Sequence, residues 1–202
     1  MAIRRIGLTG GIGSGKSTVA AIWVAKGAIL VDTDAISRSL TEAGGAAMPA
    51  VRLEFGNQFV DVQGALDRQR MRELAFADPS AKRRLEAILH PLIGAEAMAQ
   101  AARSSNRVIV FDVPLMSESS HWRGRSDRIL VVDCSEQTQV ERVMRRAGWQ
   151  EEQVRRVIAQ QAPRPVRRAI ADAIIHNDGQ SLATLQAAVH SLWALWVDSV
   201  AA

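Results

Sequence analysis

The chain has 202 residues, of which 48% are apolar and 23% charged, and its formal net charge is +4 at pH 7. This length suits one α/β domain with a full core and room for inserted subdomains, rather than two independent domains. The lone Cys134 excludes an internal disulfide, and no apolar run is long enough to cross a membrane. The N-terminus passes almost directly into a glycine-rich motif, which leaves no room for a signal peptide. We therefore expect a cytoplasmic protein with no membrane partner.

Arginine dominates the basic residues, with 22 arginines and only three lysines. Arginine suits planar, bidentate contact with phosphate, so its placement matters more than the net charge. The chain has no tract of about five to eight consecutive basic residues, no tyrosine, and few aromatic side chains that could stack on bases. We therefore expect no nucleic-acid partner.

A glycine-rich segment near the start of the chain, residues 10–17, matches the phosphate-binding pattern G-x-x-x-x-G-K-[ST]. An apolar run that includes Ile6 and Leu8 precedes it, and residues with helical spacing, such as Val19 and Trp23, follow it. The pattern therefore predicts a strand, a phosphate-binding loop and a helix. The alternative is a glycine-rich turn that only starts a helix.

Each residue type in this segment has a physical role. We expect Gly10, Gly11, Gly13 and Gly15 to adopt φ values closed to other residues, so that the backbone wraps an anion and its N–H groups point inward. The helix N-terminus adds a partial positive charge. The side chains would reach different groups: Lys16 the β- and γ-phosphates, Ser17 a Mg²⁺ ion, and Thr18 the α-phosphate. The expected nucleotide-binding residues in this segment are Gly11, Gly13, Ser14, Gly15, Lys16, Ser17 and Thr18.

Two acids follow the second predicted strand, residues 28–32. In a doubly wound sheet, ligands bind at the carboxyl ends of the strands, where Asp32 and Asp34 lie. One carboxylate could orient and deprotonate an acceptor hydroxyl while the other supports Mg²⁺. The alternative is that Asp34 only caps a helix that begins at Ala35. The residues alone leave both interpretations open.

Residues 44–106 have helical spacing, with a long alanine-rich pattern over residues 80–102 that we expect to be interrupted by a bend at His90 and Pro91. No strand pattern is obvious in this block. A block of this length exceeds a simple crossover helix, so it predicts a helical subdomain that receives the second substrate. A lone histidine such as His90 is more often a buried structural donor than a catalytic group.

Two further apolar runs, residues 107–114 and 128–133, each predict a strand that contains or ends in an acid, Asp112 or Asp133. Either acid could support Mg²⁺ beside a phosphate loop.

Eight arginines then fall between residues 142 and 168, and Arg142, Arg145 and Arg146 share one helical face. Such a segment is typical of a lid that neutralises phosphate charge, although a solvated basic face is the alternative.

The C-terminal part predicts a short strand within residues 168–179 and an amphipathic helix over residues 181–200. We expect the apolar stripe of this helix to belong to the core. The residues of that stripe are Leu182, Leu185, Ala188, Val189, Leu192, Trp193, Leu195 and Trp196.

With these motifs in order, nearly the whole chain resembles the dephospho-coenzyme A kinases. The resemblance is carried by residues 8–18, Asp32 and Asp34 with Arg38, residues 89–93, residues 113–115 with Glu118, and Gln161, Arg164, Arg167, Ala171, Asp172, Asn177 and Gly179. It implies a P-loop kinase fold: a five-stranded parallel sheet flanked by helices, with a helical substrate subdomain and a lid. It also implies transfer of the ATP γ-phosphoryl group to the 3′-hydroxyl of dephospho-coenzyme A.

The resemblance assigns roles to particular residues. Asp34 matches the general base, with Arg38 and His90 on the acceptor side. During catalysis, lid residue Arg146 and Lys16 would both contact phosphate. Asn177 lies where the family approaches adenine. Ser17 and Asp112 would hold Mg²⁺.

The implied organisation is a single kinase domain whose core comprises residues 1–40, 107–140 and 169–202. The helical subdomain spans residues 44–106 and the lid residues 141–168, and we expect a monomer or weak homo-oligomer.

Three departures from the family pattern, Thr33, Gly94 and the pair Met116 and Ser117, bear on acceptor binding. A nucleoside or nucleotide kinase of the same fold is the main rival. A nucleotide-operated switch should carry Asn-Lys-x-Asp, which this chain lacks.

Overall fold

The computed structural model describes residues 4–104, 108–118 and 120–200, which fold into two compact units. The first, here the sheet unit, comprises Met1–Val31 and Ser104–Ala202, and the second, here the helical unit, is Asp32–Arg103. Arg107, at the start of the predicted third strand, lies outside the described residues, as do the side chains of Glu118 and Ser120. No helix in the described part of the chain is both long and apolar enough to cross a bilayer.

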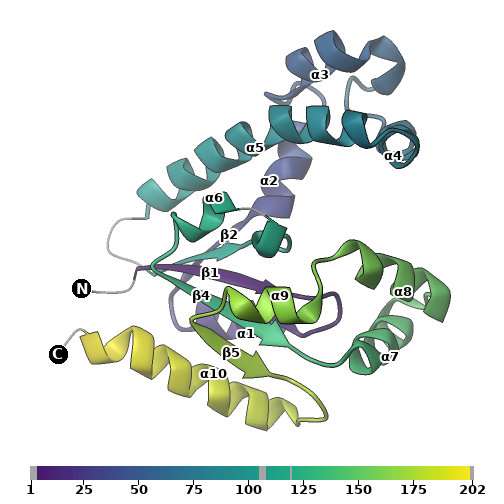
Figure 1. The fold of residues 1–202 in the computed structure, drawn as a ribbon. Helices are drawn as coiled ribbons and strands as arrows, with labels where there is room; N and C mark the ends of the chain where they lie inside the picture. Colours follow the sequence, from purple (N-terminus) through teal and green to yellow (C-terminus); the bar gives the residue numbers. More distant parts are fainter. Residues whose placement is uncertain (1–3, 105–107, 119, 201–202) are drawn as a thin grey trace. The chain divides into compact units, whose positions relative to one another are not determined.

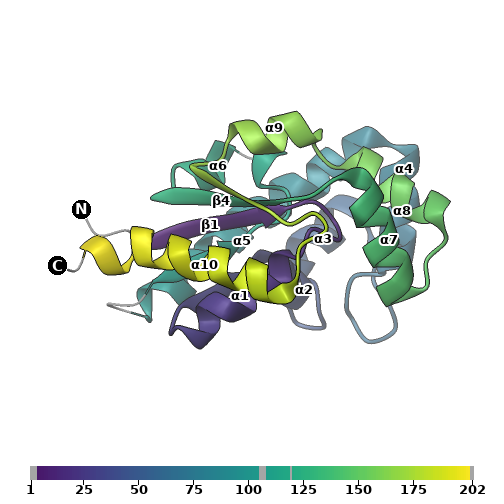
Figure 2. The same cartoon turned by 90° about the horizontal axis from the view of Figure 1, so that it is seen from below.

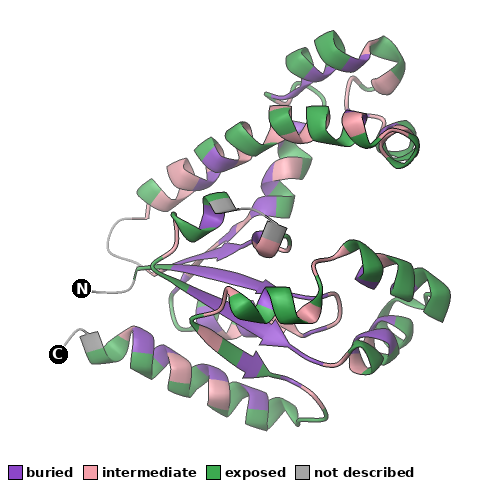
Figure 3. Cartoon of the chain, in the orientation of Figure 1, coloured by how far each residue is buried: buried purple, intermediate pink, exposed green. Residues whose placement is uncertain are grey.

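A five-stranded sheet organises the sheet unit (Figure 1). Its strands are β1 (Arg5–Gly10), β2 (Ile29–Asp32), β3 (Ile109–Asp112), β4 (Arg128–Asp133) and β5 (Ala173–His176), in the order β2-β3-β1-β4-β5. Strand β1 pairs in parallel with β3 and β4, and β4 with β5. The central strands β1, β3 and β4 are buried over almost their whole length (Figure 3), as expected for a sheet covered on both faces. The predicted five-stranded parallel sheet is confirmed.

The helices of this unit are α1 (Lys16–Ala25), α6 (Ser120–Arg123), α7 (Glu136–Ala147), α8 (Glu151–Gln160), α9 (Arg164–Ala169) and α10 (Leu182–Trp196), with short 3₁₀ turns at Met116–Glu118 and Asp198–Val200. Helices α1 and α10 lie side by side along the sheet (Figure 2). The predicted lid, residues 141–168, corresponds to most of α7, all of α8 and most of α9.

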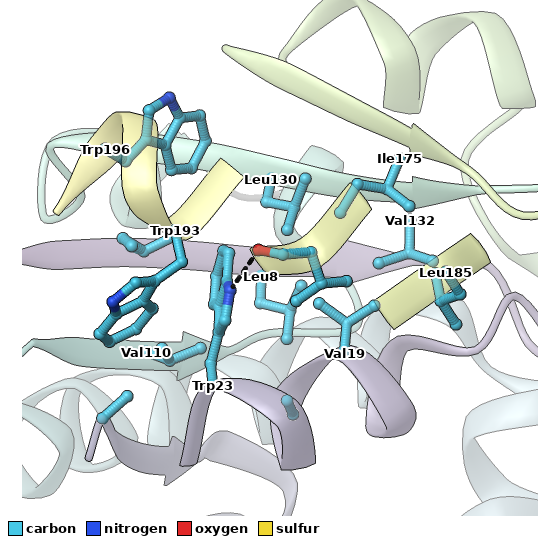
Figure 4. Close-up of a cluster of buried hydrophobic side chains, with 14 residues drawn as sticks. Leu8, Val19, Trp23, Val110, Leu130, Val132, Ile175, Leu185, Trp193 and Trp196 are labelled. Atoms are coloured by element: carbon cyan, nitrogen blue, oxygen red, sulfur yellow. Dashed lines mark hydrogen bonds between the residues drawn. The ribbon is translucent and has the colours of Figure 1, made fainter. Parts of the chain in front are cut away.

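A core of aromatic and aliphatic side chains joins α1 and α10 to the strands (Figure 4). Trp23 is fully buried, and its ring centroid lies 6.0 Å from that of Trp193. The Trp23 indole N–H donates to the Val189 carbonyl at 3.3 Å, which pairs its only polar atom. The predicted core positions Leu182 and Leu195 are 59% and 64% exposed, so for these two residues the prediction was wrong.

Four helices form the helical unit: α2 (Thr33–Leu40), α3 (Met48–Phe55), α4 (Arg68–Ala77) and α5 (Pro79–Ala102), with a 3₁₀ turn at Asn57–Phe59. Helix α5 packs against the other three. An isolated antiparallel bridge joins Val60 to Leu66 where no strand was predicted.

Helix α5 runs without interruption through His90 and Pro91, so the predicted interruption of the helical pattern there is wrong. A proline within a helix removes one backbone N–H, here the donor that would face the Ala87 carbonyl. Packing of α5 against α2, α3 and α4, with Ala81 and Ala97 buried, keeps the helix continuous. His90 is exposed on this helix, so the expectation of a buried structural histidine is also wrong.

Candidate active site

The loop between β1 and α1 has the backbone that a phosphate site requires. Gly13 and Gly15 have φ values of +74° and +97°, a region that favours glycine. Gly10 and Gly11 do not have positive φ, so the predicted reason for these two glycines is wrong. They are needed for space: a Cβ on Gly11 would lie 2.0 Å from the Gln139 side-chain nitrogen, and one on Gly10 would lie 2.6 Å from the Val132 carbonyl oxygen.

The loop leaves its N–H groups available to an anion. The Gly11 carbonyl accepts from the Ser14 N–H at 3.1 Å, and the Gly15 carbonyl from the Thr18 N–H at 3.0 Å. The N–H groups of Gly13, Gly15, Lys16 and Ser17 have no hydrogen-bond partner within the described residues. Of these, Lys16 and Ser17 belong to the first turn of α1, where N–H groups lack intrahelical partners and the helix dipole is positive. The arrangement is a cradle for phosphate oxygens.

Lys16 and Asp112 lie together beside this loop. The Lys16 ammonium donates to Asp112 Oδ1, and the two side chains are 16% and 12% exposed. Asp112 ends β3, next to β1 in the sheet, and Ser17 is exposed in the first turn of α1. No three His, Cys, Asp or Glu side chains of the described residues gather into a metal site of their own. The oxygen donors of Ser17 and Asp112 fit Mg²⁺, which typically takes one or two protein oxygens and completes its shell with water and phosphate.

Asp133, the other acid that ends an apolar strand, has a different surrounding. Its carboxylate, 2% exposed, accepts from Arg164 at 2.7 and 2.8 Å and from Arg168 at 2.9 Å, and His176 Nδ1 lies 3.3 Å away. Burial alone would raise the pKa of Asp133, but the hydrogen bonds and charge of Arg164, with smaller effects of His176 and Arg168, lower it below its ordinary value. Asp133 thus anchors α9 to the end of β4.

Asn177 and Arg142 both contact the loop. Asn177 is buried, and its side-chain nitrogen donates to the Ser14 carbonyl at 2.7 Å. Arg142 lies 3.4 Å from the carbonyl oxygens of Gly13 and Ser14, at the long end of the hydrogen-bond range. Arg146, predicted to contact phosphate, is exposed and has no hydrogen bond or ion pair to another described residue.

Two glutamines that the sequence did not single out for the site also contact the loop. Gln139, on α7, donates to the Ile12 carbonyl at 2.7 Å, and Gln161, after α8, accepts from the Ile12 N–H at 3.0 Å. Gln161 belongs to the family pattern, but that pattern assigns it no contact. Gln139 carries no local signal, because its contact joins residues 127 positions apart.

The predicted acceptor residues belong to the helical unit. Asp32 caps α2, because its carboxylate accepts from the Ala35 N–H at 2.9 Å, so the alternative in which Asp34 is the cap is wrong. Asp34 is exposed in the first turn of α2. Arg38, also on α2, lies 3.8 Å from Asp32, and His90 is exposed on α5. The buried side chain of Thr33 and buried Gly94 are the departures from the family pattern in this unit.

Comparison with known proteins places these features in a family. The family model described as dephospho-CoA kinase matches residues 4–183. A dephospho-CoA kinase of Burkholderia lata is 52% identical over 197 residues, covering 98% of both chains. The crystal structure of a Thermus thermophilus protein has a TM-score of 0.78 at 31% identity, covering 96% of this chain and 98% of that one. A dephospho-CoA kinase from Campylobacter jejuni has a TM-score of 0.70 at 21% identity, a likeness of fold alone, over 95% and 96% of the two chains.

These matches run along almost the entire chain rather than the phosphate loop alone. They confirm the predicted P-loop kinase fold and identify the protein as an enzyme of the kinase class, for which ATP is the phosphoryl donor. The family model includes the loop, Lys16, Asp112, the anchored α9 and the Asn177 turn within its matched residues. The chain therefore belongs to the dephospho-CoA kinase family.

Proposed function

We propose that this protein transfers the γ-phosphoryl group of ATP to the 3′-hydroxyl of dephospho-coenzyme A, the final step of coenzyme A synthesis. The observation that carries the proposal is the phosphate cradle with Lys16, set in a chain that matches the family model over residues 4–183. The cradle supports phosphate binding, and the family supports the acceptor.

On the nucleotide side, the loop amides bind the ATP phosphates and Lys16 reaches the β- and γ-phosphates. Thr18 lies within the same first turn of α1 and would add a hydroxyl near the α-phosphate. Asn177 approaches the adenine of ATP, in addition to donating to the Ser14 carbonyl. Ser17 and Asp112 would hold Mg²⁺, which would neutralise charge on the phosphates.

On the acceptor side, Asp34 orients the 3′-hydroxyl and accepts its proton. This role suits an exposed carboxylate whose helix is already capped by Asp32. Arg38 and His90 contact the acceptor, and residues 44–106 form the subdomain that receives it. Gly94 has no side chain that could contact a phosphate of the acceptor, so other residues make those contacts.

The lid, residues 141–168, closes over the phosphates and excludes water. Arg146 is exposed on α7 and stabilises charge that develops during transfer, while Arg142 is already engaged with the loop. Catalysis is then mainly positioning and electrostatic stabilisation. We further propose that the enzyme acts in the cytoplasm as a monomer or weak homo-oligomer, with no nucleic-acid or membrane partner.

A steady-state competition assay tests this function against a nucleoside or nucleotide kinase of the same fold. Dephospho-coenzyme A, nucleosides and nucleoside monophosphates are offered together with ATP, and each product is quantified. We expect dephospho-coenzyme A to be phosphorylated in preference to the others. Preferred phosphorylation of a nucleoside monophosphate would refute the assignment.

A further inference from the structure

Ile12, at the middle of the phosphate loop, is held through both of its backbone polar groups by side chains of α7 and of the segment that follows α8. Its carbonyl accepts from Gln139 Nε2 at 2.7 Å, and its N–H donates to Gln161 Oε1 at 3.0 Å. Its side chain packs against the apolar cluster of α7 and α8. That cluster consists of Val140, Val143, Val154 and Ile158.

The neighbouring carbonyls of the loop are held in the same way. The Ser14 carbonyl accepts from Asn177 at 2.7 Å, and Arg142 lies 3.4 Å from the Gly13 and Ser14 oxygens. An anion site requires this arrangement, because a carbonyl oxygen turned toward a phosphate would repel it. Side chains from α7 and from the turn after β5 therefore supply the donors that hold these carbonyls outward.

Peptide geometry connects each held carbonyl to a free N–H. In a trans peptide, the carbonyl of one residue and the N–H of the next point to opposite sides of the chain. When Gln139 holds the Ile12 carbonyl, the Gly13 N–H is directed away from Gln139. The Ser14 carbonyl, held by Asn177, fixes the Gly15 N–H in the same way. Both N–H groups are without a partner among the residues that the structure describes.

The surroundings of Gln139 indicate a role beyond packing. The residue is 1% exposed, and its Oε1 has no hydrogen-bond partner among the described residues. A buried amide oxygen without a partner costs free energy, which an apolar side chain would not incur at this atom. What an apolar side chain could not do is donate to the Ile12 carbonyl.

We infer that Gln139 and Gln161 are positioning residues for ATP: through Ile12 they set the direction of the loop amides that bind its phosphates. The inference deepens the proposed function, and it rests on that function only for the identity of the nucleotide. Gln139 must be a donor and Gln161 must be an acceptor, so the same substitution has different effects at the two positions.

The test replaces each glutamine by glutamate, which is close in size but cannot donate when ionised. Gln139→Glu places an oxygen against the Ile12 carbonyl, and we expect the Kd and KM for ATP to rise roughly ten- to a hundredfold, with a smaller change in kcat. Gln161→Glu keeps the acceptor, and it should weaken ATP binding less than Gln161→Met, which removes it. The matched control is Gln137→Glu, an exposed position on the same helix, which should bind ATP as the wild type does.

ATP affinity is measured by calorimetric titration of the intact chain without acceptor, and the fold of each variant is checked by urea unfolding. If Gln139→Glu fails to fold, Gln139→Met, which adds no charge, should still raise the Kd for ATP severalfold. Wild-type affinity in a folded Gln139→Glu or Gln139→Met variant would overturn the inference, as would an equal loss in Gln137→Glu. Turnover of dephospho-coenzyme A by the wild type is assayed in parallel, so that failure of the proposed function is recognised separately.

Discussion

Substitution of Asp133 by Asn tests how α9 is held to the sheet. The change removes the charge of a carboxylate that is 2% exposed and that accepts hydrogen bonds from two arginines. Arg164 binds it through two nitrogens, at 2.7 and 2.8 Å, and Arg168 through one, at 2.9 Å. Asparagine keeps one carbonyl oxygen but presents an NH₂ group to guanidinium donors, so at least one of these bonds is lost.

The expected cost follows from burial and charge. Breaking one side of a fully buried ion pair costs about 3–5 kcal/mol. The two arginine side chains, however, are 31% and 45% exposed, so water compensates part of their lost contact. The remaining bonds to charged groups are worth about 1.5–3 kcal/mol each. We therefore expect Asp133→Asn to lower the free energy of unfolding of the sheet unit by about 2–3 kcal/mol.

Urea unfolding followed by tryptophan fluorescence measures this change. All five tryptophans belong to the sheet unit: Trp23, Trp122, Trp149, Trp193 and Trp196. With a denaturant slope of about 2–3 kcal/mol/M, the midpoint should fall by about 1 M at an unchanged slope. The control is Glu152→Gln, which removes the charge of an exposed partner of Arg156 and should cost under about 0.5 kcal/mol. A midpoint for Asp133→Asn equal to that of the control would refute the reasoning.

Three further predictions concern the loop, the acceptor base and pH. Gly11→Ala should raise the Kd for ATP by about tenfold or more, because the new Cβ would lie 2.0 Å from the Gln139 side-chain nitrogen. Asp34→Asn should lower kcat by roughly 10²–10⁴, with a smaller effect on the Kd for ATP, because it removes the proposed base. Burial would raise the pKa values of Asp133 and Asp172, but their arginine partners lower both below the ordinary value of 3.8. The stability from these pairs is therefore complete above the unfolded-state pKa, and the urea midpoint should fall as pH drops below about 4 through the folded-state values.

The two substitutions each have a control. Gly124→Ala should leave ATP binding unchanged, because a Cβ there meets no atom within 4 Å. Glu42→Gln changes an exposed acid just beyond α2 and should leave kcat unchanged. Near-wild-type turnover of Asp34→Asn would remove Asp34 from the base role, and wild-type ATP affinity of Gly11→Ala would contradict the close packing of the loop. A urea midpoint that stays constant from pH 7 to 3 would contradict the pKa argument.

Local patterns predicted the parts of the molecule that depend on neighbouring residues. The phosphate loop and the five strands follow from glycine spacing and apolar runs, which act over a few positions. Tertiary packing decided the rest. It kept α5 helical through Pro91, although proline usually disturbs a helix. It left Leu195 exposed within a stripe that sequence periodicity assigned to the core.

In the candidate site, too, a motif predicts some residues, whereas tertiary packing brings in others. Lys16 was predicted from a motif, and its contact with Asp112 then places the two side chains together. The requirement for glycine at position 11 has a cause that lies outside the motif, because Gln139 fills the space where a side chain would be. Gln139 approaches the loop through the packing of α7, and no spacing along the chain encodes that contact. Sequence therefore predicted the groups that would face the phosphates better than the groups that hold the loop.

Whether the enzyme phosphorylates dephospho-coenzyme A is tested by identifying the product that the purified protein makes from ATP and dephospho-coenzyme A. Mass spectrometry and phosphorus NMR determine whether one phosphoryl group is added and which oxygen carries it. We expect coenzyme A, with the new phosphate on the ribose 3′-oxygen, and no product from an analogue that lacks the 3′-hydroxyl. Phosphate at any other position, or no transfer to dephospho-coenzyme A, would contradict it.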